Sequence, residues 1–344
     1  MPIYKDDNGT YTVRFYSEDP VRGVRKQIKK RGFKTKREAV QWESKQILDT
    51  KNVRTSATFW EILEKMLDNN DSSEDTRRKK EMWVRMYFAD FADKPIEDIS
   101  KASLVDWRNG LKSSRLATRT LNNGLRYVRS VFTFYTTVYG GVNKGSVLKS
   151  FKLSKEDKTE MKIWTPEEFQ RFADAIENPV VKAYFTFLFW SGCRRGEGIA
   201  LTKDCFTGNR VHIYRSMKHF KNGFLSLKTD SSERIITLDE KTMQVLEPWI
   251  QAADPFIFGK VSPIGITTIN REFKKAIKKS GVSPIRVHDL RHSHASLLLN
   301  NGVNIIAVSK RLGHATITQT LETYAHLMQE SEDQMLEVLQ KVHK

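Results

Sequence analysis

The chain has 344 residues, with 58 lysines and arginines against 41 aspartates and glutamates, so its net charge is +17 and its pI is near 9.7. This length accommodates two or three domains, and no run of about 18 apolar residues is present to form a membrane span. Two cysteines, Cys193 and Cys205, exclude a disulfide framework and a Cys-x-x-Cys metal site. With no apolar signal core at the N-terminus, we expect a reducing cytoplasm, and the charge favours a polyanionic partner, most often nucleic acid.

Residues 1–56 are predicted to form a small module of three strands and one helix. Residues 7–10 read as a hairpin turn, residues 10–16 and 24–31 alternate like strands, and Thr35 caps a helix over 36–48. One sheet face is basic and aromatic, and such a face fits a DNA major groove. A merely solvated sheet face is the alternative. The candidate DNA contacts of this module are Arg14, Tyr16, Arg25, Lys29 and Arg31.

Residues 57–150 follow a polar linker and are predicted to form an all-α domain. Apolar residues recur at helical spacing near 59–67, 74–90, 101–111 and 118–139. The last of these helices also carries arginines, of which Arg119 and Arg126 are candidate DNA contacts. A compact helical domain with a basic edge can hold phosphates without reading sequence. A packing domain whose charges are only solvated is an equally good interpretation of this segment.

Residues 151–344 are predicted to form a third, α+β domain with a C-terminal tail helix. An apolar helix over 180–190 leads into Gly192-Cys193-Arg194-Arg195-Gly196-Glu197, in which Glu197 lies one helical turn from Arg194 and could hold its guanidinium. Short strands are expected at 211–214, 224–228 and 234–238. Lys228 ends one of them just before a turn, where a lysine can reach a substrate, although taken alone it reads as a surface lysine.

Five of the eight histidines fall between residues 288 and 326. His288 and Arg291 project from one side of a helix start over 289–300, whose positive dipole end favours a phosphate. Two further short helices then place His314 and Tyr324 within reach of one pocket. His288 and His292 also have the i, i+4 spacing of a zinc pair, but the general-base Glu is replaced by Asp and Arg291 sets a cation beside the metal. His292 and His294 are interpreted as packing or supporting residues.

These motifs, in this order, resemble the tyrosine recombinase (phage integrase) family. The resemblance covers residues 164–326 and rests on the segments 192–197, Lys228-Thr229, 288–292, Leu312-Gly313-His314 and Thr323-Tyr324. The helical middle domain resembles the family's core-type DNA-binding domain. The first 56 residues resemble the arm-type module of integrases from conjugative transposons and from phages of Gram-positive bacteria. One departure is Gly198, where the family usually has a larger helix former.

The resemblance implies a catalytic role for six residues. Tyr324 would be the nucleophile, which forms a 3′-phosphotyrosyl link and frees a 5′-hydroxyl. Lys228 would protonate that 5′-oxygen, and His288 would accept the tyrosine proton. The non-bridging oxygens would be held by Arg194, Arg291 and His314, with Glu197 as a support residue. No metal and no other cofactor is implied.

The resemblance also implies partners. The substrate would be double-stranded DNA at attachment sites, bound by a homo-tetramer in the cytoplasm of a bacterial host, at the nucleoid, and an accessory excision factor is possible in this family. The tail over 329–344 can pack on a neighbouring protomer or on its own domain. A type IB topoisomerase-like nicking-closing enzyme, a DNA-binding regulator on a recombinase fold and, more distantly, a zinc hydrolase are the alternatives.

Overall fold

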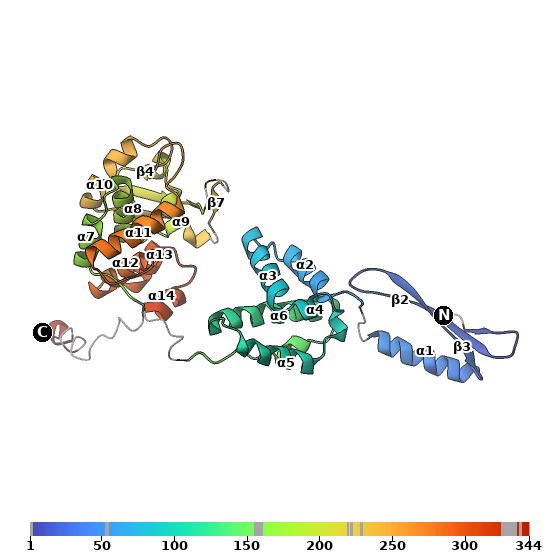
Figure 1. Cartoon of the computed structure of the whole chain (residues 1–344). Coiled ribbons are helices and arrows are strands. Elements are labelled where there is room, and N and C mark those ends of the chain that lie inside the picture. The colour runs from blue at the N-terminus through green and yellow to red at the C-terminus, as the bar shows by residue number, and fades with distance from the viewer. Residues whose placement is uncertain are drawn as a thin grey trace. The chain divides into compact units, whose positions relative to one another are not determined.

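Figure 1 shows the computed structural model of the chain, which describes residues 3–51, 55–154, 161–218, 220, 223–227, 230–324, 336 and 339–343. The chain divides into two compact units, residues 1–159 and 160–344. The predicted boundary at residue 56 lies inside the first unit and stays a prediction. Within the described segments, no helix combines the length and the apolar character needed to cross a bilayer.

The first unit begins with the predicted small sheet and helix. Strands β1 (Ile3–Lys5), β2 (Tyr11–Glu18) and β3 (Arg25–Phe33) form an antiparallel sheet in the order β1-β2-β3, and helix α1 (Lys36–Lys51) follows. Val13 and Ala39 are fully buried between sheet and helix, and the rings of Phe33 and Trp42 lie 5.6 Å apart beside them. One sheet face is therefore covered, which leaves the other for a ligand.

The rest of the first unit is helical, as predicted. Its α-helices are α2 (Phe59–Asn69), α3 (Glu74–Tyr87), α4 (Ala89–Ala92), α5 (Lys101–Gly110) and α6 (Thr118–Tyr139). Thr58 and Glu61 form a reciprocal capping box at the start of α2, which satisfies two backbone N–H groups. The apolar faces of α2 and α6 meet in one core, and Trp83 of α3 packs into it across Gly124.

The connection between β2 and β3 is bound to the helical part of this unit. Val21 is buried in the helical core, and Arg22 makes two-pronged hydrogen bonds to Glu61. The carboxylate of Asp19 accepts hydrogen bonds from the Thr55 hydroxyl and the Ser56 amide at 2.6 and 2.9 Å. These contacts hold the strand connection against the start of α2.

The second unit is an α+β domain built around one apolar helix. Its first helices are α7 (Pro166–Asp174), α8 (Pro179–Ser191), α9 (Arg195–Ile199), α10 (Glu240–Gln251) and α11 (Ile266–Ser280). A three-stranded sheet lies among them in the chain and consists of β4 (Phe206–Thr207), β5 (Arg210–Ile213) and β8 (Arg234–Thr237). A second, two-stranded sheet pairs β6 (Arg215–Ser216) with β7 (Leu225–Ser226). Helix α8 is buried on almost all sides, as its apolar sequence requires, so it forms the centre of the core.

Three short helices complete this unit: α12 (Asp289–Asn300), α13 (Ile305–Leu312) and α14 (Ile317–Tyr324). Helix α12 packs on α8, and α13 packs on α12, α14 and β8. The segments that begin or end these helices therefore lie beside the loop that follows α8. The predicted tail helix falls mostly outside the described residues.

Candidate active site

The loop after α8 places the first arginine. Gly192 ends α8 in the left-handed conformation at φ 70°, and a side chain there would approach His294 to 2.6 Å, so glycine is required on both counts. Arg194 follows directly before α9. Its Nη1 donates to Glu197 Oε1 at 2.8 Å and its Nη2 donates to the Gly313 carbonyl at 3.0 Å. The expected ion pair between Arg194 and Glu197 is present.

A second arginine, which the sequence reasoning did not single out, holds the other side of Glu197. Arg234 Nη2 donates to Glu197 Oε2 at 2.8 Å, and its Nε donates to the Arg311 carbonyl at 2.7 Å. Burial alone would raise the pKa of Glu197, but Arg234 and then Arg194 outweigh it, and the pKa is lowered. The carboxylate is thus ionised, with a guanidinium on each side.

Arg291 lies on the first turn of α12 and is almost fully buried. Its Nη1 donates to the Gly192 carbonyl at 3.0 Å, whereas its buried Nη2 has no hydrogen-bond partner among the described residues. Burial and the positive charge of Arg194 lower its pKa to about 10. A buried guanidinium nitrogen left without a protein partner calls for a bound acceptor.

Two histidines accompany these arginines. His314 follows Gly313 at the end of α13, and its Nδ1 lies 2.7 Å from the Thr320 hydroxyl. His288 directly precedes α12. The pKa values of both are lowered to about 4 by burial first and then by neighbouring positive groups, Arg291 among them. Both rings are therefore neutral at neutral pH, so each can offer one N–H and one acceptor nitrogen.

Tyr324 ends α14 with its side chain only 1% exposed. The ring packs with Ala295, Val308 and Leu312. Its hydroxyl lies 2.7 Å from Nδ1 of His292. His292 was expected only to pack or to support, and the tertiary structure places its ring nitrogen within hydrogen-bond distance of the Tyr324 hydroxyl. His294, by contrast, is buried and its Nε2 accepts a hydrogen bond from Arg311 Nε at 3.0 Å, so it supports packing as expected.

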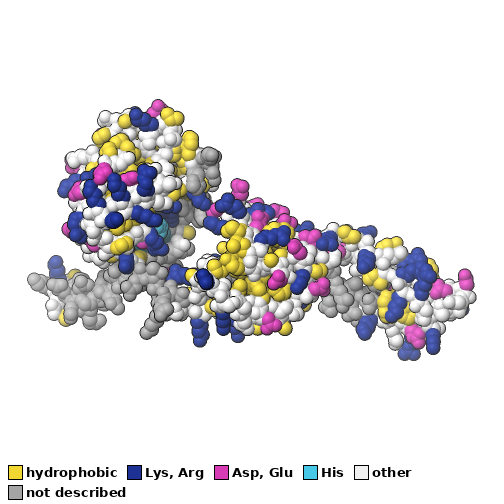
Figure 2. Space-filling view, viewed as in Figure 1, with side chains coloured by type: hydrophobic (Ala, Val, Ile, Leu, Met, Phe, Trp, Pro, Cys, Tyr) yellow, Lys and Arg dark blue, Asp and Glu magenta, His cyan; other side chains and the backbone are white. Residues whose placement is uncertain are grey.

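Two of these arginines, Arg194 and Arg291, and three of the histidines line one pocket of about 300 Å³. Its walls come from the loop before α9, the start of α12, the loop after α13 and helix α14. On the surface of the second unit, histidine atoms lie beside a gathering of lysine and arginine side chains (Figure 2). The pocket is lined by Arg194, His288, Arg291, His292, His314, Gln319, Glu322 and Thr323.

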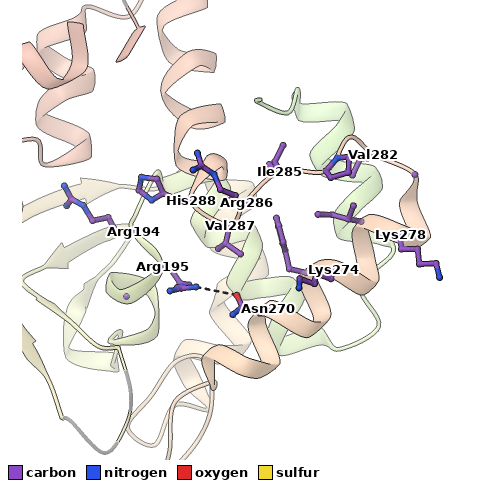
Figure 3. Close-up of a pocket in the computed structure, with 15 residues that line it drawn as sticks. Arg194, Arg195, Asn270, Lys274, Lys278, Val282, Ile285, Arg286, Val287 and His288 are labelled. Carbon is purple, nitrogen blue, oxygen red and sulfur yellow. Dashed lines mark hydrogen bonds between the residues drawn. The ribbon is translucent and has the colours of Figure 1, made fainter. Parts of the chain in front are cut away.

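A larger groove of about 1070 Å³ adjoins this pocket and shares Arg194 and His288 with it. Figure 3 shows it between α11 and the segment leading to α12, with Arg195 donating to the Asn270 amide oxygen at 3.4 Å. The floor is apolar, and the other cations along its walls are Lys274, Lys278 and Arg286.

The remaining predicted site residues are distributed as follows. Lys228 lies outside the described residues. Arg119 and Arg126 are exposed on α6, and Tyr16 is 65% exposed on the open sheet face. The pKa of Lys29 is lowered by desolvation and by the positive charges of Arg31 and Arg14, so these three cations gather on the sheet. Arg25 instead donates to Glu18 at 3.0 Å.

Gly198, the one departure from the family pattern, is explained by close packing. A side-chain carbon there would lie 3.0 Å from Leu188 and 3.1 Å from Tyr184, both on the central helix α8. Glycine lets α9 approach α8 closely, and the neighbouring Glu197 keeps its contacts with both arginines.

Comparisons with known proteins find family models and relatives that match this chain. A model of the phage integrase family matches residues 162–331, and a model of an arm DNA-binding domain matches residues 2–49. The ICEBs1 integrase of Bacillus subtilis strain 168 is 27% identical over 98% of this chain and 99% of its own length. The tyrosine recombinase XerD of Listeria monocytogenes is 34% identical, but over 35% of this chain and 46% of its own length.

Two solved structures share the fold. The Tn1549 transposon integrase in complex with transposon right end DNA has a TM-score of 0.68 at 22% identity, over 84% of this chain and 100% of that one. A lambda integrase tetramer bound to a Holliday junction has a TM-score of 0.60 at 16% identity, over 93% of this chain and 97% of that one. The topoisomerase-like and regulator alternatives are not favoured by these matches. The chain belongs to the tyrosine recombinase (phage integrase) family and is a site-specific DNA recombinase.

Proposed function

We propose that Tyr324 is the nucleophile of the recombination reaction. Its hydroxyl would attack the scissile phosphodiester, form a 3′-phosphotyrosyl bond and release a 5′-hydroxyl. Because the bond energy stays in this ester, an incoming 5′-hydroxyl can reverse the step without ATP. A phenol with a pKa of about 10 is a better leaving group than an alkoxide, which favours that return step.

The observation that carries this proposal is the convergence of donors on the pocket beside Tyr324. Arg194, Arg291 and His314 come from three separate elements and line the same cavity of about 300 Å³. The buried Nη2 of Arg291 lacks a partner among the described residues. A phosphate oxygen would satisfy it, and the three donors would stabilise the charge that grows on the non-bridging oxygens in the transition state.

Family resemblance implies two further roles. Lys228 would protonate the departing 5′-oxygen as general acid. His288, which lines the pocket, is the general base that the family resemblance implies. Glu197 would hold Arg194 in place and would not touch the DNA, since its two oxygens are occupied by Arg194 and Arg234.

The substrate is proposed to be double-stranded DNA at the attachment sites of a mobile element. A duplex whose phosphate occupies the pocket would bring neighbouring phosphates over the groove in Figure 3, where the lysines and arginines would neutralise them. The open face of the β1–β3 sheet, with Lys29, Arg31 and Arg14 close together, would hold a separate arm-type site. The action would take place at the host nucleoid.

A homo-tetramer on two DNA sites is the proposed working assembly, because two duplexes must be cut and rejoined. The tetramer of lambda integrase on a Holliday junction supports this by analogy of fold. The tail over 329–344 would pack on a neighbouring protomer and couple the active sites, and an accessory factor would set the balance between excision and integration.

Covalent trapping tests the proposal. The full chain is mixed with a nicked suicide duplex carrying the end of its element, in EDTA, and a protein–DNA adduct is sought on a denaturing gel. An adduct with the wild-type chain and none with Tyr324→Phe supports the phosphotyrosine mechanism. If a duplex that the chain binds yields no adduct, or if Tyr324→Phe still forms one, the nucleophile assignment is wrong.

A further inference from the structure

The hydroxyl of Tyr324 is held by a histidine that family resemblance does not assign. His292 lies on α12, 32 residues before the tyrosine in the chain, and its Nδ1 is 2.7 Å from Tyr324 Oη. The two ring centroids are 5.8 Å apart, with the planes tilted by 57°. Because this distance is that of a direct hydrogen bond, His292 touches the atom that attacks the phosphate.

His288 is placed differently. Its ring lies edge-on to His292 at 5.1 Å between centroids, and no hydrogen bond joins it to Tyr324 among the described residues. A general base must be within hydrogen-bond reach of the proton that it removes. Geometry therefore favours His292 over His288 for the tyrosine proton.

The position of His292 also connects the tyrosine to the phosphate site. His292 lines the pocket of about 300 Å³, whereas Tyr324 packs behind it against Ala295, Val308 and Leu312. The imidazole thus stands between the buried phenol and the cavity. A proton taken from the hydroxyl is brought to the pocket wall, next to the negative phosphate that would stabilise it.

The surroundings of His292 keep its ring neutral. Burial lowers its pKa, the positive charges of Arg286 and Arg291 lower it further, and only Asp289 acts in the opposite direction. The other ionisable groups around the pocket are Arg194, His288, His314 and Glu322. A neutral imidazole with its hydrogen on Nε2 leaves the Nδ1 lone pair free to accept a proton.

The phenol needs such a base. Burial raises the pKa of Tyr324, and the charge of Arg291 offsets this only in part. A phenol in this position does not ionise by itself at neutral pH, so it must lose its proton as the oxygen bonds to phosphorus.

We propose that His292 is the catalytic residue that accepts the Tyr324 proton. The phenol oxygen bonds to phosphorus as its hydrogen passes to Nδ1, which gives an imidazolium. The bond from phosphorus to the 5′-oxygen breaks, and that oxygen leaves as a hydroxyl with a proton from a general acid. In the return step the imidazolium gives the proton back to the departing tyrosine. This assignment rests on the proposed role of Tyr324 as nucleophile.

Two substitutions at residue 292 separate a base from a positioning group. His292→Ala removes both the hydrogen bond and the base, whereas His292→Asn keeps an acceptor oxygen near the position of Nδ1 but cannot take a proton. His288→Ala is the matched control on the neighbouring ring. Formation of the covalent adduct is followed in a single turnover at pH 7.5, with the full chain saturating a nicked suicide duplex, with and without added imidazole.

We expect His292→Ala and His292→Asn both to slow adduct formation by about 10²–10⁴-fold, the range of general-base catalysis. Imidazole, which can occupy the space vacated in His292→Ala, should restore the rate of that variant at least tenfold, which is part of the roughly 10²–10⁴-fold general-base effect. It should have no effect on His292→Asn or His288→Ala. The affinity for the intact duplex, measured by gel shift, should stay within a factor of about 2 of wild type, because His292 carries no charge for a phosphate.

Other outcomes overturn the proposal. A His292→Asn variant as fast as wild type would mean that the residue only orients the hydroxyl. Faster cleavage by His292→Ala would mean that the contact restrains the tyrosine. Imidazole rescue confined to His288→Ala would return the base to His288. In all three cases the wild-type adduct and the inactive Tyr324→Phe leave the nucleophile assignment intact, whereas failure of that pair removes the foundation of both proposals.

Discussion

Arg234 and Glu197 form an ion pair of 2.8 Å in which both side chains are buried, at 6% and 1% exposure. The pair joins the first residue of β8 to α9, directly after Arg194. The same guanidinium donates to the carbonyls of Arg311 and Ser232. The buried guanidinium of Arg234 thus connects strand β8 to the end of α13, just before His314. It also connects β8 to the Glu197 carboxylate, which holds Arg194.

Removing Arg234 should destabilise the chain strongly. Arg234→Met leaves the buried Glu197 carboxylate with only one cation, and breaking one side of a buried pair costs about 3–5 kcal/mol. The measurement is urea unfolding of the full chain, followed in the transition of the second unit. Glu233→Gln, which removes the exposed pair between Glu233 and His212, is the control and should change the free energy of unfolding by less than about 1 kcal/mol. Equal effects of the two substitutions would contradict this account.

The buried His294 should make the chain acid-sensitive. Burial and the positive charge of Arg311 lower its pKa from 6.5 to about 3. Between these pH values the unfolded chain binds a proton that the folded chain excludes, so stability falls as pH falls below 6.5. From pH 7 to pH 5 this group should remove about 2 kcal/mol of stability.

His294→Gln tests this pH dependence, since its amide oxygen can accept the Arg311 hydrogen bond but cannot be protonated. The free energy of unfolding should fall less steeply between pH 7 and 5 in this variant than in wild type. His343→Gln, at an exposed histidine, is the substitution control. Parallel curves for wild type and His294→Gln would refute the assignment.

The open face of the small sheet should contribute to salt-dependent DNA binding. Lys29→Gln removes one of three clustered cations, and we expect the slope of log K against log salt for arm-site DNA to decrease by about 1. Lys45→Gln, on the exposed side of α1, should leave the slope unchanged. Binding isotherms by fluorescence anisotropy at several salt concentrations provide the measurement. An unchanged slope for Lys29→Gln would place the arm contacts elsewhere.

The C-terminal tail should be needed for assembly but not for cleavage. A chain ending at Gln329 keeps every pocket residue, so it should still form the covalent adduct on a nicked duplex. If the tail packs on a neighbour, its loss should convert DNA-bound tetramers into smaller complexes. Light scattering of the DNA complexes gives their mass, and tetramers that survive the deletion would mean that the tail packs on its own domain.

Local sequence patterns predicted the helices around the site well. The apolar helix predicted over 180–190 is α8 (Pro179–Ser191). The helix predicted over 289–300 is α12. Such features depend on residues within one or two turns, so no knowledge of distant segments is needed. Of the strand predicted over 224–228, residues Leu225–Ser226 form β7, which pairs with the two-residue strand β6, and residue 228 lies outside the described residues.

The sequence by itself determined the family, the order of the motifs and the pairing of Arg194 with Glu197, because these depend on residue types at short, readable spacings. Only the tertiary structure decided that His292 meets Tyr324 and that Arg234 meets Glu197. The members of these pairs are 32 and 37 residues apart. Their contact depends on how α12, α14, α9 and β8 pack around α8, and side-chain packing between distant elements leaves no periodic signal along the chain.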